Sequence, residues 1–445
     1  MEALLAGAQQ DGANEFLIGN LRYGLDPQGS YISARRAATS FATTNICSPK
    51  TVKQLQVNLA SASEWLDPSS VLLSFLIRET GGVHSLFPAS PNPAILFNRF
   101  QLRLGSTLIE DVQDWGKLNH IMSMYSMSPG KLRDYHQTGF GTEETATNPN
   151  AFLSSQHKAK KIPASGTKRV YMKFDLSALF SQHRYLPLFA LGGMGCQISL
   201  TLAPGAESLI VADSPTAAAA DYSTEYQIED IRVLADFISL QDDLQESYNA
   251  SLLQGSALRL PVKLWSCQTM FLTSDHAGSF DLALSKNYTR LASLFAFFNQ
   301  NPPDTNYGSD KLVNTNYFPG GPAIEELRYA LHLGSKRIPD EDVRGSKEAW
   351  YRLLGCLGMR DSLAHCTSID EAAYNSTHFG LGIDLERIPS LMASGENVSA
   401  GQTIQLRIRG MKGANGATDV PRTATVCTHS EAVISIQDTV VDIFE

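Results

Sequence analysis

Charged residues are scarce in this chain of 445 residues: Asp, Glu, Lys and Arg make up 18%, against about 25% in an average soluble protein. A disordered, expanded chain is excluded, because such chains combine high charge with few apolar residues, and here 43% of residues are hydrophobic. Excess positive charge is lacking too, since the formal net charge is −9. No bulk basic field is therefore available to hold nucleic acid by counterion release. The thin charge indicates that other copies or partners cover much of the surface.

Long apolar runs are also missing. The densest one, Leu291–Phe298, is far shorter than the roughly 20 residues that a helix needs to span a bilayer. Met1–Gly19 has no basic region and only a short apolar patch, so we expect no signal peptide. These features predict a soluble protein that is not secreted.

Cysteine is rare and is not arranged in pairs. The six cysteines are Cys47, Cys196, Cys267, Cys356, Cys366 and Cys427. None forms a CxxC pair, and their spacings match neither a zinc site nor a disulfide framework. We expect free, mostly buried thiols in a reducing compartment.

Catalytic motifs are absent: the chain has no GxSxG, HExxH, P-loop or GxGxxG pattern. His365 and Cys366 are adjacent, but neighbours in sequence rarely face each other, and nothing indicates a third, orienting group. Glu110-Asp111 and Glu341-Asp342 could be paired carboxylates for acid–base chemistry. We interpret them instead as charges at the positive N-termini of two helices.

The only basic cluster is Lys158–Lys161, with Lys168 and Arg169 beyond it. It lies in a polar stretch without interleaved aromatic residues, which favours a solvated loop over a nucleic-acid or subunit contact. The sequence therefore predicts no catalytic, cofactor-binding or metal-binding residue, no cofactor, and no enzymatic activity.

Strand patterns fill most of the chain. Val52–Leu59 and Phe100–Leu104 alternate apolar and polar residues with period two, and similar segments recur up to Ala424–Ile436. Many short strands with few helices indicate sandwiches or barrels. Helical spacing is confined to three places, which are residues 112–125, 349–354 and 242–253. The last is near the midpoint, where a connector between domains would lie.

Three segments lack such patterning. Residues 1–49 are nearly neutral and rich in Gly, Gln, Asn, Ala and Ser, so we interpret them as an extended arm. The stretches 128–168 and 299–322 are long and polar. Loops of that length are usually functional or mobile, and we expect the arm and the first loop to contact other subunits.

Two segments about half a chain apart are similar. Arg99–Ile109 and Arg328–Ile338 share six of eleven residues, and each leads to an acidic pair, a valine and a helix that carries a tryptophan. A match of six in eleven residues arises by chance about once in a chain of this length. The inference of a repeat therefore rests on the spacing of the two segments by half the chain and on the similar residues that follow each of them. Coincidence between two ordinary strand–turn–helix units stays an alternative; we favour a tandem pair of similar β-domains.

In this pattern and order of segments the chain resembles the double jelly-roll major capsid proteins of icosahedral DNA viruses, above all the smaller virophage and Polinton-like members. The resemblance covers about residues 45–440. The segments on which the resemblance rests are Arg99–Met122, Phe174–Leu202, Ile238–Leu264 and Phe379–Ile408. None of these segments is an invariant signature.

The resemblance implies an all-β fold of two tandem eight-stranded jelly rolls, with a few short helices in the connecting loops. The domains expected are an arm at 1–49, a first jelly roll at 50–241, a connecting helix at 242–256 and a second jelly roll at 257–445. No catalytic residue is carried over. The chain is shorter than hexon-like members, which leaves room only for modest surface towers.

The implied function is that of a major capsid protein whose pseudo-hexagonal trimers tile an icosahedral shell around a double-stranded DNA genome. The implied partners are the other copies in the trimer and neighbouring capsomers, a penton protein at the five-fold vertices, and minor or cement capsid proteins reached through the arm. Sequence-specific nucleic-acid binding is not expected, and the sequence leaves open whether an internal membrane is present. The expected location is the virion, assembled inside the host cell.

Two other classes of protein fit the residues. A tandem β-sandwich that binds carbohydrate or another ligand is the main alternative, and a β-rich hydrolase is the second. Aromatic residues clustered on one exposed set of loops would favour the binding protein. A convergent pair of carboxylates in a cleft would favour the enzyme.

Overall fold

The structure, a computed structural model, describes most of the chain. The described residues are 32–88, 90–126, 137–141, 161–209, 223–272, 278–299, 327–360, 367, 369, 371–375, 379–388, 394–398, 403–411, 423–437 and 440–444. The expected subunit-contact segments therefore fall largely outside them: only 32–49 of the arm, and 137–141 and 161–168 of the first loop, are described.

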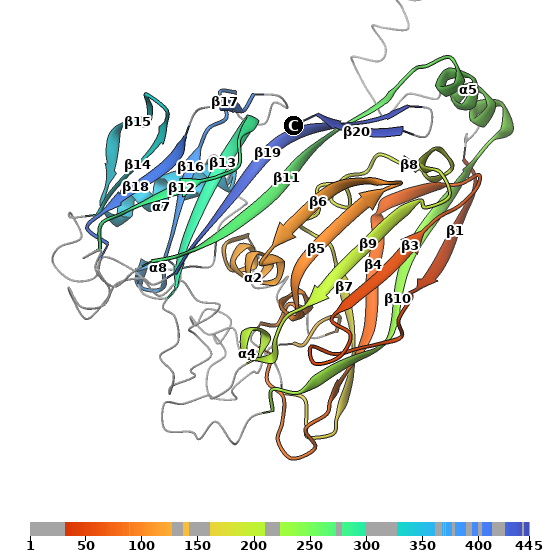
Figure 1. The fold of residues 1–445 in the computed structure, drawn as a ribbon, viewed down its shortest axis with the longest axis horizontal. Coiled ribbons are helices and arrows are strands. Elements are labelled where there is room, and N and C mark those ends of the chain that lie inside the picture. Colours follow the sequence, from red (N-terminus) through yellow and green to blue (C-terminus); the bar gives the residue numbers. More distant parts are fainter. Residues whose placement is uncertain are drawn as a thin grey trace, which may run out of the picture.

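The first half folds into two facing antiparallel sheets (Figure 1). The larger has the order β1 (Ile32–Phe41), β10 (Tyr226–Leu240), β4 (Trp65–Glu79) and β7 (Thr167–Lys173), with β2 (Ile46–Cys47) beside β10 and β8 (Leu186–Pro187) beside β4. The smaller has the order β3 (Gln54–Leu59), β9 (Cys196–Leu202), β5 (Phe97–Leu104) and β6 (Thr107–Gln113). In the strands of the core, alternate residues face the space between the sheets, as Leu55, Val57 and Leu59 do in β3.

The second half repeats this arrangement. Its larger sheet has the order β11 (Leu258–Phe271), β19 (Thr423–Gln437), β13 (Tyr288–Asn299) and β16 (Gly380–Asp384), with β17 (Glu396–Val398) beside β13 and β20 (Val440–Phe444) beside β19. The smaller has the order β12 (Phe280–Leu284), β18 (Ile404–Arg409), β14 (Arg328–Leu333) and β15 (Lys336–Arg344). The prediction of two tandem eight-stranded jelly rolls is confirmed, because main strands in the same chain order occupy the same places in both halves.

The repeated segments are equivalent, as the sequence predicts. β5 and β14 are each the third strand of a four-stranded sheet, and each turns into the edge strand that follows it. Gly105 and Gly334 make these turns at the same positive φ of 58°. Each glycine N–H donates to a carbonyl from the segment that leads into the neighbouring strand, Gly105 to Gly195 and Gly334 to Thr403.

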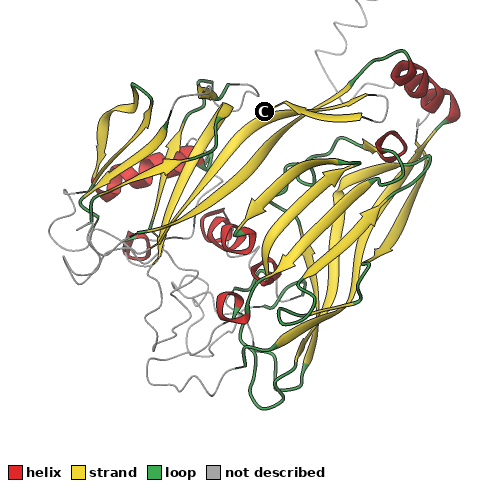
Figure 2. Cartoon of the chain, viewed as in Figure 1, coloured by secondary structure: helices red, strands yellow, loops and turns green. Residues whose placement is uncertain are grey.

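Helices are few and flank the sheets (Figure 2). The longer ones are α2 (Trp115–Ser126), α5 (Asp242–Leu253) and α7 (Gly345–Cys356), close to the three predicted helices. The short ones are η2 (Pro93–Leu96), η4 (Leu188–Leu191), α4 (Gly205–Ser208) and α8 (Glu371–Tyr374). α5 joins the two jelly rolls and is held to the first by Gln245, whose Oε1 accepts a hydrogen bond of 2.8 Å from Trp65 Nε1. No helix among the described residues is long and apolar enough to cross a membrane.

The start of the first jelly roll corrects the expected domain boundary. Ile32–Phe41, assigned from sequence to an arm ending at residue 49, is strand β1 and pairs with β10 over its whole length. Its side chains are exposed on both faces, so the alternation that marks other strands is absent. Backbone pairing with β10 places it in the sheet, and ion pairs of Arg35 with Asp67 and Asp236 and of Arg36 with Glu64 support that pairing. Neither kind of contact leaves a periodic pattern in the sequence.

The turn glycines yield the first prediction. Gly334→Ala should lower the free energy of unfolding by about 1–2 kcal/mol, because an L side chain is disfavoured at positive φ. Gly105→Ala should cost more, since its Cβ would also lie 2.9 Å from the carbonyl oxygen of Leu191. Denaturant unfolding of the two variants measures both effects.

Gly193→Ala is the matched control, because no atom lies within 4 Å of the Cβ that it would add. It should be neutral or slightly stabilising. Equal losses at all three positions would contradict the assigned roles of Gly105 and Gly334.

Candidate functional site: the contact between the two jelly rolls

Helix α2 of the first jelly roll lies against the second (Figure 1). Its described side chains are buried except for the half-buried Lys117, unlike a helix with one face in water. Trp115 fixes its start: the indole stacks on Phe100 with ring centroids 5.2 Å apart and lies 6.1 Å from Phe174. The first domain therefore holds the helix firmly while its far side meets β11 and β19.

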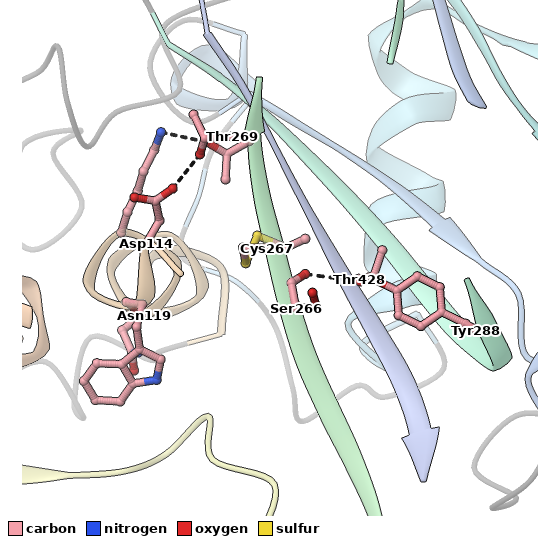
Figure 3. The surroundings of a disulfide bond; sticks show 11 residues. Asp114, Asn119, Ser266, Cys267, Thr269, Tyr288 and Thr428 are labelled. Atoms are coloured by element: carbon pink, nitrogen blue, oxygen red, sulfur yellow. Dashed lines mark hydrogen bonds between the residues drawn. A yellow bond between two sulfur atoms is a disulfide. The ribbon is translucent and has the colours of Figure 1, made fainter. Parts of the chain in front are cut away.

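Polar bonds join α2 to the second jelly roll (Figure 3). Thr269 Oγ1 on β11 donates to Asp114 Oδ2 at 2.6 Å, and Lys117 Nζ donates to Thr425 Oγ1 on β19 at 2.8 Å. The two threonine hydroxyl oxygens are 3.1 Å apart, so one small network crosses between the domains. Half-buried charged groups that are bonded in this way define a register as well as adding stability.

An aromatic contact extends the junction. Tyr125, near the end of α2, stacks on Phe297 of β13 with ring centroids 6.0 Å apart. Gly380 of β16 makes this approach possible, because a Cβ there would lie 2.8 Å from the Tyr125 hydroxyl. The two domains thus share a packed core as well as a polar contact.

The sheet edges also meet. The Thr107 hydroxyl of β6 donates to the Val441 carbonyl of β20 at 2.7 Å. β6 is the outer strand of its sheet, and open strand edges attract other chains. The contact therefore covers the β6 side of the first jelly roll with the β11–β19 side of the second.

A disulfide lies beside this contact and corrects the cysteine prediction. Cys267 of β11 and Cys427 of β19 are cross-strand neighbours with Cα atoms 4.1 Å apart, and they are bonded (Figure 3). Cys47, Cys196 and Cys356 are free, and Cys366 lies outside the described residues. The pair was missed because its members are 160 residues apart, and only the strand register brings them together.

Glu110 is a buried carboxyl group in strand β6, not at a helix N-terminus as the sequence suggested. Its Oε1 accepts from Ser177 Oγ at 2.8 Å and from the Leu179 N–H at 3.1 Å, while Oε2 has no hydrogen-bond partner. Burial raises the pKa of Glu110 from 4.5 to about 7. The group ties the segment after β7 to the strand that reaches the second domain.

The other predicted acidic residues do not form a catalytic pair. Asp111 points to the opposite face of β6 and binds Arg99, with Arg99 Nη2 at 2.6 Å from Oδ2. In β15, also a strand where a helix start was expected, Asp342 pairs with Arg337 at 2.8 Å and Glu341 is exposed. The Asp111 pair joins β6 to β5 and the Asp342 pair lies within β15, so these acids form ion pairs and do not converge on one another.

The remaining candidate residues are not brought together within the part of the chain that the structure describes. His365, Cys366 and Lys158–Lys160 lie outside the described residues, and Lys161 is exposed. Lys168 Nζ donates to the Phe140 carbonyl at 2.5 Å, and Arg169 pairs with Asp230, so both act within the first domain. Within the described ranges, no group of three or more His, Cys, Asp or Glu side chains could hold a metal ion.

A cavity of about 570 Å³ opens where α5 joins the two jelly rolls. Its wall is largely apolar, and Trp65 and Tyr248 meet edge to face there with centroids 5.1 Å apart. Among the described residues that line it, the basic ones are His183, Arg184 and Arg259, and none is a carboxylate. Its volume suits a small ligand, but a hydrolytic pair is missing from it.

Glu110 generates a prediction about pH. Folding raises its pKa, so its protonated form stabilises the folded state; this contribution is complete below about pH 4.5 and is lost as pH rises through about 7. The Glu110→Gln variant lacks this titration. Relative to wild type it should gain stability above pH 7, by at most about 3 kcal/mol, with little gain near pH 4.5.

Thermal unfolding across that pH range measures the effect. Asp111→Asn is the control, because it removes a neighbouring carboxylate that is ion-paired and half-buried. A Glu110→Gln gain that is the same at every pH would contradict the assignment.

Comparisons with known proteins support the fold. No protein-family model matches the chain, and no curated protein matches it in sequence. Solved structures do: VP54 of PBCV-1, which was fitted into a reconstruction of the virophage Sputnik, has a TM-score of 0.60 at 12% identity and covers 95% of this chain and 99% of its own. The Faustovirus major capsid protein has a TM-score of 0.58 at 6% identity and covers 94% and 93%.

The mavirus major capsid protein has a TM-score of 0.51 at 8% identity and covers 95% of this chain and 92% of its own. These matches span both halves of the chain. The similarity therefore extends to the tandem arrangement of two jelly rolls and is not limited to a single β-sandwich. The chain has the double jelly-roll fold of the major capsid proteins of virophages and large double-stranded DNA viruses.

Proposed function

We propose that this chain is a structural major capsid protein, located in the virion, where it builds an icosahedral shell around double-stranded DNA. The observation that carries the proposal is the match of both jelly rolls, over 95% of this chain and 99% of VP54. The firm contact between the domains supports it, because a shell unit must keep two domains in one orientation. No enzymatic activity is expected.

The unit that tiles the shell is a homotrimer. Three chains bring six similar β-domains around one axis, which fits pseudo-hexagonal positions in a lattice. A true five-fold position cannot take such a trimer, so a separate penton protein would fill it. Residues 1–31, which precede β1, would reach neighbouring capsomers or minor capsid proteins.

One observation favours the alternative, a ligand-binding tandem β-sandwich. The cavity beside α5 has an aromatic wall and a basic rim, in the size range of small-ligand sites. However, a cavity at this position also arises simply because two domains and their connecting helix do not fill the space between them. A ligand role would show as a monomer whose melting temperature rises with an added sugar or anion.

Assembly is the first test. The purified protein should sediment as a species of three times the chain mass, and negative-stain images of the protein should show hexagonal outlines. The interface should bury on the order of 2,000–5,000 Å² per pair with an apolar centre, as obligate interfaces do, so moderate salt should not dissociate it. A stable monomer under all ionic conditions would remove this proposal.

The second test concerns the N-terminal segment, residues 1–31. Deleting Met1–Tyr31 should leave the unfolding of the chain unchanged and lower the yield of intact shells. A deletion that continues to Phe41 would also remove β1, so it should destabilise the first jelly roll. Unchanged shell yield from the shorter deletion would contradict the role given to residues 1–31.

A further inference from the structure

The cavity beside α5 is walled by three parts of the chain. Trp65 of β4 and Leu186 of β8 belong to the first jelly roll, and Leu260 of β11 and Ile436 of β19 belong to the second. Tyr248 comes from α5, which lies at the same end of the molecule as β8 (Figure 1). A molecule held in this cavity would therefore touch both domains and the helix that joins them.

The apolar part of the wall is fixed by contacts of its own. Besides its hydrogen bond to α5, the Trp65 indole lies edge to face with Phe189, with ring centroids 5.5 Å apart. Leu186 is held by the pairing of β8 with β4. Leu260 and Ile436 are buried in the second jelly roll. The cavity is thus formed without a ligand, as small-molecule sites usually are.

The basic groups of the cavity have donors to spare. Arg184, before β8, and Arg259, on β11, are exposed, and neither forms an ion pair or a side-chain hydrogen bond with another described residue. Arg35 of β1 differs, because its guanidinium pairs with Asp67 and Asp236. The two unpaired guanidinium groups come from different jelly rolls and line one cavity.

The polar groups of the cavity select the class of ligand. The described residues that line it include no Asp, Glu, Asn, Gln, Ser or Thr. Sugar hydroxyls both donate and accept hydrogen bonds, so a sugar would find few side-chain acceptors here. Guanidinium groups only donate, and they pair well with a carboxylate. Cationic donors beside an apolar, aromatic wall match a molecule with an anionic head and an apolar chain.

We propose that this cavity binds a single-chain amphipathic anion of the fatty-acid class. Its carboxylate lies at Arg184 and Arg259, and its chain lies along Trp65 and Tyr248. Burial of the chain supplies affinity, and the guanidinium groups select the charged head. The inference goes beyond the proposed function and does not depend on it, since a shell can form with this cavity empty or filled.

Calorimetric titration of the purified full-length chain with sodium dodecanoate, below its micelle concentration, tests the site. Saturable binding of one dodecanoate per chain is expected, together with a rise in melting temperature. Dodecanol, which has the same chain without the charge, should bind at least about tenfold more weakly, and acetate should not bind. Absence of saturable dodecanoate binding, or equal affinity for dodecanol, would overturn the inference.

Variants of the lining residues locate the binding. Arg184→Gln and Arg259→Gln should each weaken dodecanoate binding roughly 3- to 10-fold. Leu244→Glu places a carboxylate in the apolar wall and should abolish binding; the melting of the ligand-free variant checks its fold. Arg103→Gln is the matched control, because Arg103 is an exposed arginine of β5 that has no partner among the described residues and does not line the cavity. An equal loss in this control would contradict the site.

Two other occupants are outcomes of the same test. Association with phosphatidylglycerol vesicles, without binding of free dodecanoate, would assign these residues to a membrane surface and overturn the inference. Dodecanoate binding that appears only after deletion of Met1–Tyr31 would mean that the chain's own terminus fills the cavity, and would overturn it as well. Each failure leaves the capsid proposal standing, because sedimentation and shell yield test that proposal separately.

Discussion

An open sheet edge is the constraint on which this molecule depends. Each jelly roll has outer strands whose backbone groups need a partner, and a single jelly roll in solution would leave them uncovered. Within the chain, β6 and α2 of the first jelly roll pack against β11 and β19 of the second, so one outer strand of each jelly roll is covered. The burial of all described α2 side chains but Lys117, the threonine network and the stacking of Tyr125 on Phe297 belong to that contact. Among the described strands, β1 and β15 remain as outer strands of their sheets.

Much of the fold could be predicted because burial leaves a mark in the sequence. Strands with one face inward alternate in polarity, and the turn glycines at Gly105 and Gly334 lie in matching segments. β1 was missed for the opposite reason, since a strand exposed on both faces carries no alternation. Its place depends on backbone hydrogen bonds to β10 and on ion pairs of Arg35 and Arg36 with partners far along the chain, and neither leaves a local pattern.

The site was harder to predict because its members meet only in three dimensions. Cys267 and Cys427 are distant in sequence and adjacent in the sheet, so spacing rules for cysteine could not pair them. Glu110 and Asp111 were placed at a helix start, but β6 continues through both, and alternation sends one inward and the other to Arg99. Asp114 and Thr269 carry no motif, and their bond depends on how two whole domains pack.

The link through α5 has a kinetic consequence. Because α5 keeps both jelly rolls in one chain, their mutual contact forms at a fixed effective concentration, which is in the millimolar range for short flexible linkers. A ring of six separate β-domains would need six molecules to meet, with a steep dependence on concentration. In the proposed trimer, three tethered pairs would need only three molecules to meet, so the yield of rings would fall less steeply when copies are few.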